Sequence, residues 1–340
     1  MENKQILFTS INTAELLSVE YPEPSENEVA VETYFSSISC GTEKANITGE
    51  PNVSIYATEE ETIAFPREAG YSSSGVVIAK GKGVKSVEVG DKVVMSWSQH
   101  KKINVLPEEN VVKFEGDKIS MQDAALCHIG TFPMAALRKT RLEIGESMMV
   151  MGLGILGLMA VLFAKSAGAV PVIAVDPVPA RREKALKFGA DYALDPFEKD
   201  FVEKVKKLTD NGVNTAIEVT GLGAGLNQCL DCMAPLGRIA LLGCTRDKNF
   251  TVDYYRKVHG PGIQLMGAHT AARPKLESAA GLFTQRDDIK TILQLCSMGR
   301  IKLADMVDEV VEPAACATVY NRLVHDKNFP TVVQFDWRNI

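Results

Sequence analysis

The chain has 340 residues, of which 46% are hydrophobic and 24% charged, and its formal net charge is −6. This length suits two domains better than a single core, and the composition is that of a globular protein. The acidic balance, without a long run of Lys or Arg, argues against nucleic acid as a partner.

No segment of the sequence is expected to enter a membrane or to direct secretion. The N-terminus, MENKQILFTS, lacks a basic region followed by an apolar one. The longest apolar stretch, residues 150–164, is too short to span a bilayer and is interrupted by glycines. Seven cysteines are scattered along the chain, which is typical of reduced thiols. We therefore expect a cytoplasmic protein with no membrane partner.

The first third of the chain carries short β-type runs broken by Gly and Pro. Examples are VAVETYF, SGVVIAKGKGV and GDKVVMSW. The segment GVKSVEVGDKVV predicts a strand, a turn at Gly90-Asp91 and a second strand. We expect this part to form an irregular, mostly antiparallel barrel.

From Met148 onwards, strand-like and helix-like segments alternate. Helical periodicity is present in ARREKALKFG and DFVEKVKKLTD. This alternation predicts an α/β fold with a parallel, doubly wound sheet. After His269 comes more helix and then TVVQFDW, a late strand that could rejoin the first part. The six strand-like runs are MMVMG, PVIAVDP, DYALDP, NTAIEVTG, RIALLGC and IQLMGA.

A glycine-rich turn joins the first of these strands to an apolar helix. The segment MGLGILG places Gly152, Gly154 and Gly157 in a G-x-G-x-x-G frame. Directly after a strand, this frame indicates a dinucleotide site. The first glycine permits a tight turn, the second lets the backbone approach a pyrophosphate, and the third lets helix and strand pack closely. Ile155 and Leu156, at the helix N-terminus that favours the anion, complete the predicted loop.

An acidic residue ends the second strand of this part, in VIAVDP. The Asp176 carboxylate can accept hydrogen bonds from the adenosine ribose hydroxyls, and it would repel a 2′-phosphate. This favours NAD over NADP. Arg181 lies close enough in sequence to accommodate a phosphate, or it lies against the adenine or in solvent.

The carboxyl ends of the later strands predict the rest of the nucleotide site, because ligands of doubly wound sheets bind there. Residues 243–245 and 267–269 are expected to flank the nicotinamide, and His269 to touch the nicotinamide or the substrate. The cofactor-binding residues predicted in this way are Thr220, Gly243, Cys244, Thr245, Gly267 and Ala268.

Nearly the whole chain resembles the medium-chain dehydrogenase/reductase family, which includes the zinc alcohol and sorbitol dehydrogenases. The resemblance rests on the order of SCGTE, GYSSSGVVIAKGKGVKSVEVGDKVV, AALCHIGTFPMAAL, GESMMVMGLGILGLMAVLFAKSAGA and VIAVDP. It implies a GroES-like β-barrel catalytic domain (residues 1–122 and 269–340), interrupted by a Rossmann NAD-binding domain (residues 123–268). It also implies a homodimer or homotetramer, joined through the last Rossmann strand.

The resemblance carries over only part of the family's catalytic zinc site. Cys40 matches the first metal ligand, and Thr42 matches the hydroxyl that passes on the alcohol proton. Glu43 takes the place of an acid beside the metal. Tyr71, followed by a serine, stands where zinc-dependent members have a His-Glu pair. His128 aligns with the third ligand position.

One interpretation of this altered site retains the metal. Cys40 and His128 are good zinc donors, and an oxygen of Glu68 or Glu43 could complete the ligand set. A structural zinc, by contrast, is not expected. The segment from Gly90 to Leu126 contains no cysteine, whereas such a site needs four N or S donors.

The other interpretation has no catalytic metal. His128, His100 or Lys44 then serves as general base, and Tyr71 donates a hydrogen bond to the substrate oxygen. His100 is in either case a candidate for substrate contact, although it could also be a solvated loop residue. We favour this interpretation, because two matched ligands fall short of the three protein ligands of a catalytic zinc.

The sequence thus predicts an oxidoreductase that transfers a hydride between NAD and a secondary alcohol of polyol, sugar or cyclitol type. The substrate class follows from the resemblance to sorbitol-type members, and the expected partner is a small-molecule alcohol or ketone. One alternative is a zinc-free quinone or enoyl reductase of the same superfamily, which would usually employ NADPH. Another is an NAD-binding sensor or partner protein without turnover.

Overall fold

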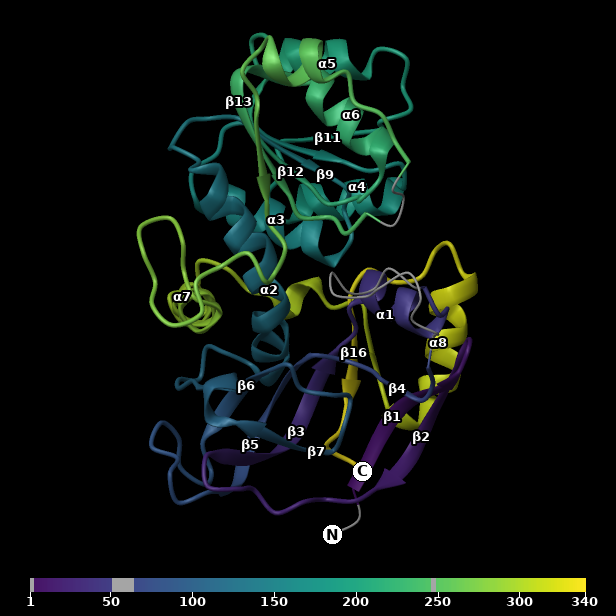
Figure 1. The fold of residues 1–340 in the computed structure, drawn as a ribbon, viewed down its shortest axis with the longest axis vertical. Helices are drawn as coiled ribbons and strands as arrows, with labels where there is room; N and C mark the ends of the chain where they lie inside the picture. The colour runs from purple at the N-terminus through teal and green to yellow at the C-terminus, as the bar shows by residue number, and fades with distance from the viewer. Residues whose placement is uncertain (1–2, 51–63, 246–248) are drawn as a thin grey trace. The chain divides into compact units, whose positions relative to one another are not determined.

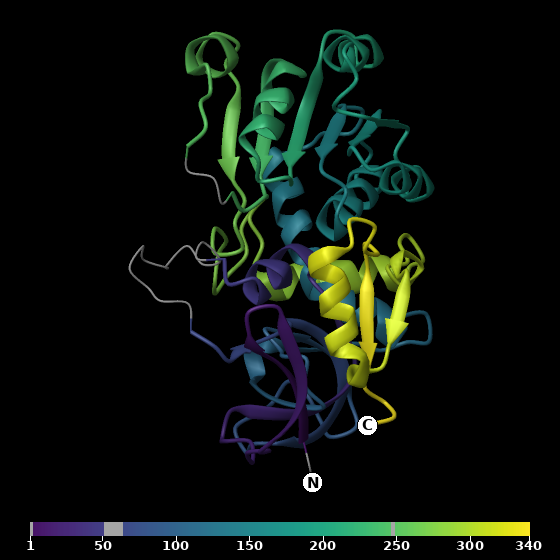
Figure 2. The same cartoon turned by 90° about the vertical axis from the view of Figure 1, so that its right-hand side faces the viewer.

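The structure, a computed structural model, describes residues 3–50, 64–245 and 249–340 (Figure 1, Figure 2). The chain divides into two compact units, the first made of residues 1–129 and 289–340 and the second of residues 130–288. Both divisions fall inside helices, α2 (Met121–Thr140) and α7 (Gln285–Ser297). The domain boundaries expected from the sequence, 122/123 and 268/269, lie earlier in the chain and stay a prediction.

The first unit contains two sheets built mainly from antiparallel strands. The smaller has the order β2-β1-β4, and the larger has the order β15-β16-β3-β5-β6-β8, with β7 also paired to β3. Among the described strands of these two sheets, β15 and β16 pair in parallel and the other pairs are antiparallel. The strands are β1 (Asn3–Ser10), β2 (Thr13–Val19), β3 (Glu28–Ser37), β4 (Arg67–Glu68), β5 (Ser72–Lys80), β6 (Lys92–Ser96), β7 (Ile103–Pro107), β8 (Val111–Lys113), β15 (Glu309–Val311) and β16 (Val333–Asp336).

The late strand rejoins the first unit, as the sequence suggested. Strand β16 pairs antiparallel with β3, with Gln334 opposite Ser37. Apolar side chains of β16, β1 and helix α8 (Cys316–His325) belong to one buried cluster, which includes Tyr320 and Trp337. In Figure 2, α8 lies beside β16. The C-terminal segment is therefore part of the core of the first unit.

The predicted hairpin within GVKSVEVGDKVV is wrong in its first half. Strand β5 ends at Lys80, no strand follows before β6, and only the turn at Gly90, with φ +93°, is present. The N–H groups of Lys85 and Ser86 donate to the Glu108 carboxylate, at 2.8 and 2.5 Å. Because a side chain takes these backbone donors, they are not available for a strand ladder.

The second unit contains one parallel sheet with the order β11-β10-β9-β12-β13-β14. The arrows of these strands point the same way in Figure 2. This order, with the first strand central and the chain turning outward in both directions, is that of a doubly wound dinucleotide-binding sheet, and it confirms the predicted α/β fold. The strands are β9 (Met148–Met151), β10 (Val172–Val175), β11 (Tyr192–Leu194), β12 (Val213–Glu218), β13 (Met233–Leu241) and β14 (Gln264–Gly267).

Helices cover both faces of this sheet because its central strands are apolar on both sides. All four residues of β9 and of β10 are buried. Met149 and Met151 pack in one core cluster with side chains of α5 and α6, whereas Val150 faces α3. Within the described ranges, every helix is too short or too polar to cross a membrane. The remaining helices are α1 (Cys40–Ile47), α3 (Ile155–Ser166), α4 (Pro179–Lys187), α5 (Phe201–Leu208) and α6 (Gly223–Asp231), with short helical turns η2 (Glu108–Asn110), η3 (Tyr255–His259), η4 (Ala304–Met306) and η5 (Pro313–Ala315).

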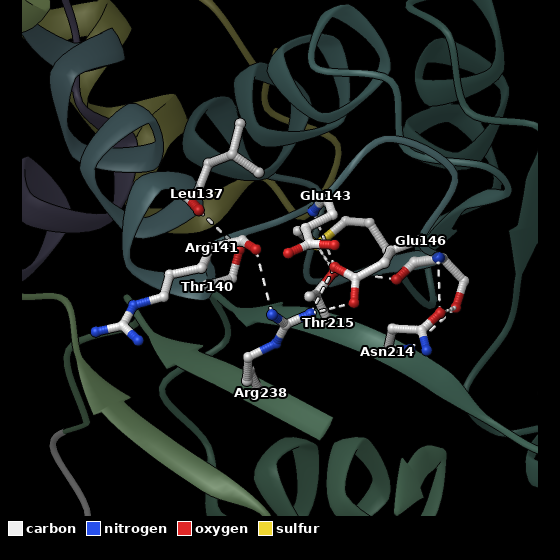
Figure 3. Close-up of polar contacts among 10 residues, drawn as sticks. Leu137, Thr140, Arg141, Glu143, Glu146, Asn214, Thr215 and Arg238 are labelled. Atoms are coloured by element: carbon white, nitrogen blue, oxygen red, sulfur yellow. Dashed lines mark hydrogen bonds and ion pairs between the residues drawn. The ribbon is translucent and has the colours of Figure 1, made fainter. Parts of the chain in front are cut away.

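A polar cluster ties together the edge of the sheet where β9 and β12 begin (Figure 3). Arg238 on β13 donates to both carboxylate oxygens of Glu146 and, at 3.2 Å, to the carbonyl of Arg141. Ser147 and Asn214 exchange hydrogen bonds, with the Ser147 hydroxyl donating to the amide oxygen at 2.8 Å. These contacts fix the register of three strands relative to the end of α2.

Replacing Arg238 by Met should destabilise the second unit by about 1–3 kcal/mol, because it leaves a largely buried Glu146 carboxylate without its charged partner. Urea unfolding followed by circular dichroism measures this. The matched control is Arg256→Met, since Arg256 is 79% exposed and pairs only locally with Asp253; there we expect little change. Equal losses in the two variants would contradict the role of the cluster.

Candidate functional site

Each of the three positions of the nucleotide loop requires or favours glycine for a different structural reason. Gly152 has φ +98°, which favours glycine. A Cβ on Gly157 would lie 1.9 Å from the Gly152 carbonyl oxygen, so only glycine allows α3 to approach β9 this closely. A Cβ on Gly154 would meet no protein atom within 4 Å. The open space beside Gly154, at the start of α3 with Ile155 and Leu156, is where the predicted pyrophosphate would fit.

Asp176 follows β10 and folds back over this loop. Its carboxylate accepts the Leu153 N–H at 2.8 Å and the Val178 N–H at 2.9 Å. Arg181 lies 3.6 Å from the same carboxylate, and Arg182 donates to the Asp176 carbonyl at 2.7 Å. The structure thus brings the acid and the glycine loop together, as predicted. Arg181 contacts the acid itself, which the sequence did not indicate.

A second acid shapes the turn after β12. Glu218 is buried, and its carboxylate accepts the N–H groups of Thr220 and Gly221 at 2.7 and 3.2 Å, as well as the Thr220 hydroxyl. Burial raises the pKa of Glu218, and these hydrogen bonds oppose the rise. Gly243 packs against the same turn, because a Cβ there would lie 2.3 Å from the Gly221 nitrogen. The role of Glu218 in this turn was not predicted, because no local sequence pattern indicates that its carboxylate accepts the N–H groups of the following residues.

The other predicted cofactor residues lie at the same edge of the sheet, because the parallel strands β12, β13 and β14 end there. Cys244 and Thr245 follow β13 and are exposed, whereas Ala268 after β14 is buried. The Gly267 carbonyl accepts a hydrogen bond from Lys139 at 2.7 Å. His269 is half-buried, and its Nδ1 accepts the Ala271 N–H at 3.1 Å.

In the first unit, Cys40 is the first residue of helix α1, and Ser39 caps that helix. The Cys40 Sγ lies 3.9 Å from the Pro330 carbonyl oxygen and 3.7 Å from that of Thr331. At these distances the Cys40 thiol is placed to donate weakly to the two carbonyl oxygens. Thr42, the predicted proton-passing hydroxyl, is exposed on α1.

Tyr71 and His128 lie together, and Tyr71 also reaches the cap of α1. The Tyr71 hydroxyl donates to the Ser39 hydroxyl. The His128 ring lies edge-on to the Tyr71 ring, with centroids 5.6 Å apart. Its Nδ1 is 2.6 Å from the Tyr71 carbonyl, which can only accept, so Nδ1 carries the proton. In the neutral ring Nε2 is therefore the basic nitrogen.

Trp97 completes this aromatic group and was missed by the sequence analysis. Its ring lies edge-on to His128 with centroids 4.7 Å apart, and it is 45% exposed. The Trp97 N–H is 3.4 Å from His128 Nδ1 but 2.8 Å from the Tyr71 carbonyl, which is the better acceptor. Trp97 has φ +57°, an unfavourable conformation for a bulky residue and one that clusters at functional sites. Nothing local in the sequence marks it.

Glu43, the predicted acid beside the metal, and His100, the candidate for substrate contact, are hydrogen-bonded to each other. Both are buried, and His100 is not a solvated loop residue. The Glu43 carboxylate accepts the Ser39 N–H at 2.8 Å, the Tyr320 hydroxyl and, at 3.1 Å, the His100 Nε2–H. Burial, with the Glu43 charge beside it, raises the pKa of Tyr320 well above its usual range, which keeps this donor protonated.

The other side of His100 is equally well satisfied. Its Nδ1 lies 2.7 Å from the Ser36 hydroxyl, which also accepts the Trp337 indole N–H at 2.8 Å. The Ser36 hydroxyl thus links the Trp337 indole to His100 Nδ1. A Cβ on Gly70, which has φ +84°, would lie 2.8 Å from this imidazole. We call Glu43, His100, Ser36, Tyr320 and Trp337 the Glu43 network.

The remaining residues considered for catalysis have structural partners. The Ser72 hydroxyl donates to the Ala125 carbonyl at 2.7 Å and is buried. The Lys44 ammonium donates to the Val324 carbonyl at 3.0 Å on the exposed side of α1. Glu68 is an exposed residue of β4. None of these positions favours a role as base or as metal ligand.

The described residues do not fit a catalytic zinc site. In residues 3–50, 64–245 and 249–340, no three His, Cys, Asp or Glu side chains come together as a metal would require. Cys40 faces carbonyl oxygens, and the Glu43 oxygens are taken by three donors. The proposed pairing of Cys40 and His128 around a metal therefore lacks a third ligand among these residues.

Comparison with known proteins gives concordant results. The family model described as "Zinc-binding dehydrogenase" matches residues 156–285. L-threonine 3-dehydrogenase of Pyrococcus horikoshii is 33% identical over 291 residues, 75% of this chain and 79% of that protein. D-guloside 3-dehydrogenase of Escherichia coli is 25% identical over 94% of this chain and 96% of its own length. The structure of 2R,3R-butanediol dehydrogenase from Bacillus subtilis superposes with a TM-score of 0.81 at 20% identity, over 98% of this chain and 99% of that one.

The nucleotide loop yields a pair of contrasting variants. Gly154→Ala should leave thermal stability nearly unchanged, since its Cβ meets no protein atom, yet weaken NADH binding at least tenfold by blocking the pyrophosphate. Gly157→Ala should instead unfold at a markedly lower temperature because of the clash with Gly152. Thermal unfolding and NADH fluorescence titration measure both. Wild-type NADH affinity in Gly154→Ala would contradict the assignment of the loop.

The Glu43 network should be sensitive to removal of its charge. Glu43→Gln sets an amide NH₂ against N–H and O–H donors, and we expect a loss of about 2–4 kcal/mol of unfolding free energy. Tyr320→Phe removes one donor and leaves the carboxylate paired with two others, so its loss should be about half or less. Chemical unfolding compares the two. A Glu43→Gln variant as stable as the wild type would show that the carboxylate is not the acceptor of these bonds.

Proposed function

The chain belongs to the medium-chain dehydrogenase/reductase family, with the zinc-type alcohol dehydrogenases, and from this we propose that it oxidises a secondary alcohol of polyol, sugar or cyclitol type with NAD. The names of its relatives support the substrate class. Threonine at C3, a guloside at C3 and butane-2,3-diol all carry the reacting hydroxyl on a secondary carbon. NAD, when bound, accepts the hydride from that carbon.

The nucleotide loop and Asp176 carry the cofactor part of the proposal. Gly152, Gly154 and the start of α3 would hold the pyrophosphate, and Asp176 would accept the ribose hydroxyls while repelling a 2′-phosphate. Arg181, 3.6 Å from Asp176, offsets part of this repulsion. We propose NAD as the preferred cofactor because the acid is held firmly at the strand end by two backbone N–H groups.

His128 is the proposed acceptor of the alcohol proton, without help from zinc. The Tyr71 carbonyl fixes the tautomer that leaves Nε2 basic, and Trp97 and Tyr71 keep bulk water from the imidazole. The hydroxyls of Tyr71 and Ser39 would orient the substrate oxygen. His100 and Lys44 do not fit the role of base, because their nitrogens are engaged elsewhere. General-base catalysis of this kind contributes about 10²–10⁴-fold.

Association into a homo-oligomer stays a prediction that the surface supports. Strand β14 ends the sheet order on one side, and its Leu265 is 38% exposed. The neighbouring helical turn η3 and the residue before it expose Tyr254 and Tyr255. An edge strand with exposed apolar side chains is suited to pairing with a second copy.

Kinetics and metal analysis together test the reaction. Purified protein should contain well under one zinc per chain and should oxidise a member of a polyol panel with NAD, at a rate that chelators do not change. His128→Asn should lower kcat/KM at least 100-fold while NADH affinity stays within twofold of the wild-type value. Tyr71→Phe should lower kcat/KM by a smaller factor, about tenfold, because it removes only an orienting hydroxyl.

The outcomes separate the competing mechanisms. One zinc per chain, lost together with activity, would overturn the metal-free mechanism. An active His128→Asn combined with an inactive Tyr71→Phe would move the proton acceptor to Tyr71. NADH binding without turnover of any alcohol would instead favour a protein that senses NAD.

A further inference from the structure

Three cationic side chains gather around the segment that follows β14 in the second unit. Arg138 and Lys139 lie in the last turn of α2, and Arg273 lies six residues after β14. One buried carboxylate, Asp288 on α7, pairs with both arginines. Arg138 Nε donates to it at 2.8 Å, and Arg273 Nη1 lies 3.4 Å from its other oxygen. Asp288 therefore pairs with two of the three cations, while Lys139 donates to the Gly267 carbonyl at 2.7 Å.

The proximity of these cations lowers the pKa values of two of them. Burial lowers the pKa of Arg273, and the charge of Arg138 lowers it further against the opposing effect of Asp288. Burial also lowers the pKa of Lys139, with Arg273 contributing repulsion. The nearby Asp287 accepts hydrogen bonds from the hydroxyls of Ser278 and Thr284. An added negative charge would relieve these repulsions.

Part of the Arg273 guanidinium is held rigidly, and part has no hydrogen-bond acceptor. Its Nη2 donates to the Thr131 carbonyl at 2.7 Å, and its side chain is only 7% exposed. Its Nε is buried without an acceptor among the described residues, and so is the hydroxyl of Thr270 three residues earlier. Buried donors of this kind are rare unless an ion, a ligand or water occupies the place.

A purely structural role of the two arginines explains their ion pairs with Asp288 but not the unpartnered donors. Bracing α2 against α7 explains Asp288 and the bonds of Arg138, whose guanidinium also lies 3.7 Å from the centre of the Phe283 ring. It explains neither the Arg273 Nε nor the Thr270 hydroxyl, both buried without a partner among the described residues, and it does not remove the repulsion between Arg138 and Arg273 that lowers the pKa of Arg273. An oxyanion carries several acceptor oxygens and a negative charge, which is the chemistry that such donors and cations bind.

We propose that Arg273, Thr270 and Lys139 bind an oxyanion, a phosphate or carboxylate group, in the second unit. Arg273 supplies a preorganised N–H and charge, Thr270 a hydroxyl donor, and Lys139 a second charge anchored on the Gly267 carbonyl. The oxyanion is either a free ion or a substituent of a larger polyol. Its binding does not depend on the proposed reaction, since no hydride or proton is transferred.

Calorimetric titration of the full chain with inorganic phosphate, at constant ionic strength, tests the site directly. We expect saturable binding that weakens at least tenfold in Arg273→Gln and at least threefold in Thr270→Val. The second variant removes one hydroxyl and leaves the Asp288 and Thr131 contacts intact, so it remains informative if the first misfolds. Arg256→Gln, an exposed arginine, serves as control and should bind as the wild type does.

A second arm uses a polyol, its phosphate and its carboxylate as titrants. Binding of free phosphate that is lost in the variants supports an ion site. Binding only of the anionic polyols, also lost in the variants, supports the proposal with the anion as a substituent. Binding that is absent for every anion, or equal in wild type, Thr270→Val and Arg256→Gln, overturns it. None of these outcomes requires turnover, so they are distinct from failure of the proposed alcohol oxidation.

Discussion

The buried charge of Glu43 is the constraint around which the first unit is organised. A carboxylate removed from water is tolerated only if donors surround it, and here they come from residues 39, 100 and 320 of the chain. Those donors join the start of α1, the loop before β7 and helix α8. Because Ser39 is one of them, the same charge sets the position of Cys40 and of the hydroxyl to which Tyr71 donates.

The second unit could be predicted almost entirely from its sequence, because its signals are local. A strand, three spaced glycines, an apolar helix and an acid after the next strand all fall within Met148 to Asp176, and the structure places them as expected. The catalytic part could not be predicted in this way. His100 is separated by 57 residues from its hydrogen-bond partner Glu43, and no periodicity in the sequence predicts this contact. The strand predicted within Gly83–Val89 is absent for a similar reason, because the distant Glu108 accepts hydrogen bonds from the backbone N–H groups of this segment.

The altered residues of the catalytic part are fully integrated into the first unit. Tyr71 has a partner in Ser39 and a neighbour in His128, and Ser72 donates to Ala125 of α2. Both residues are therefore held in place by contacts within the first unit.

Gly70 is the residue of this segment whose backbone conformation requires glycine. With φ +84° and an imidazole 2.8 Å from where a Cβ would stand, this position is closed to every other amino acid while His100 remains in place. Tyr71 and Ser72, the next two residues of the chain, do not have a positive φ, so their backbone conformations do not require glycine. The backbone conformation thus restricts the choice of amino acid at residue 70 but not at residues 71 and 72.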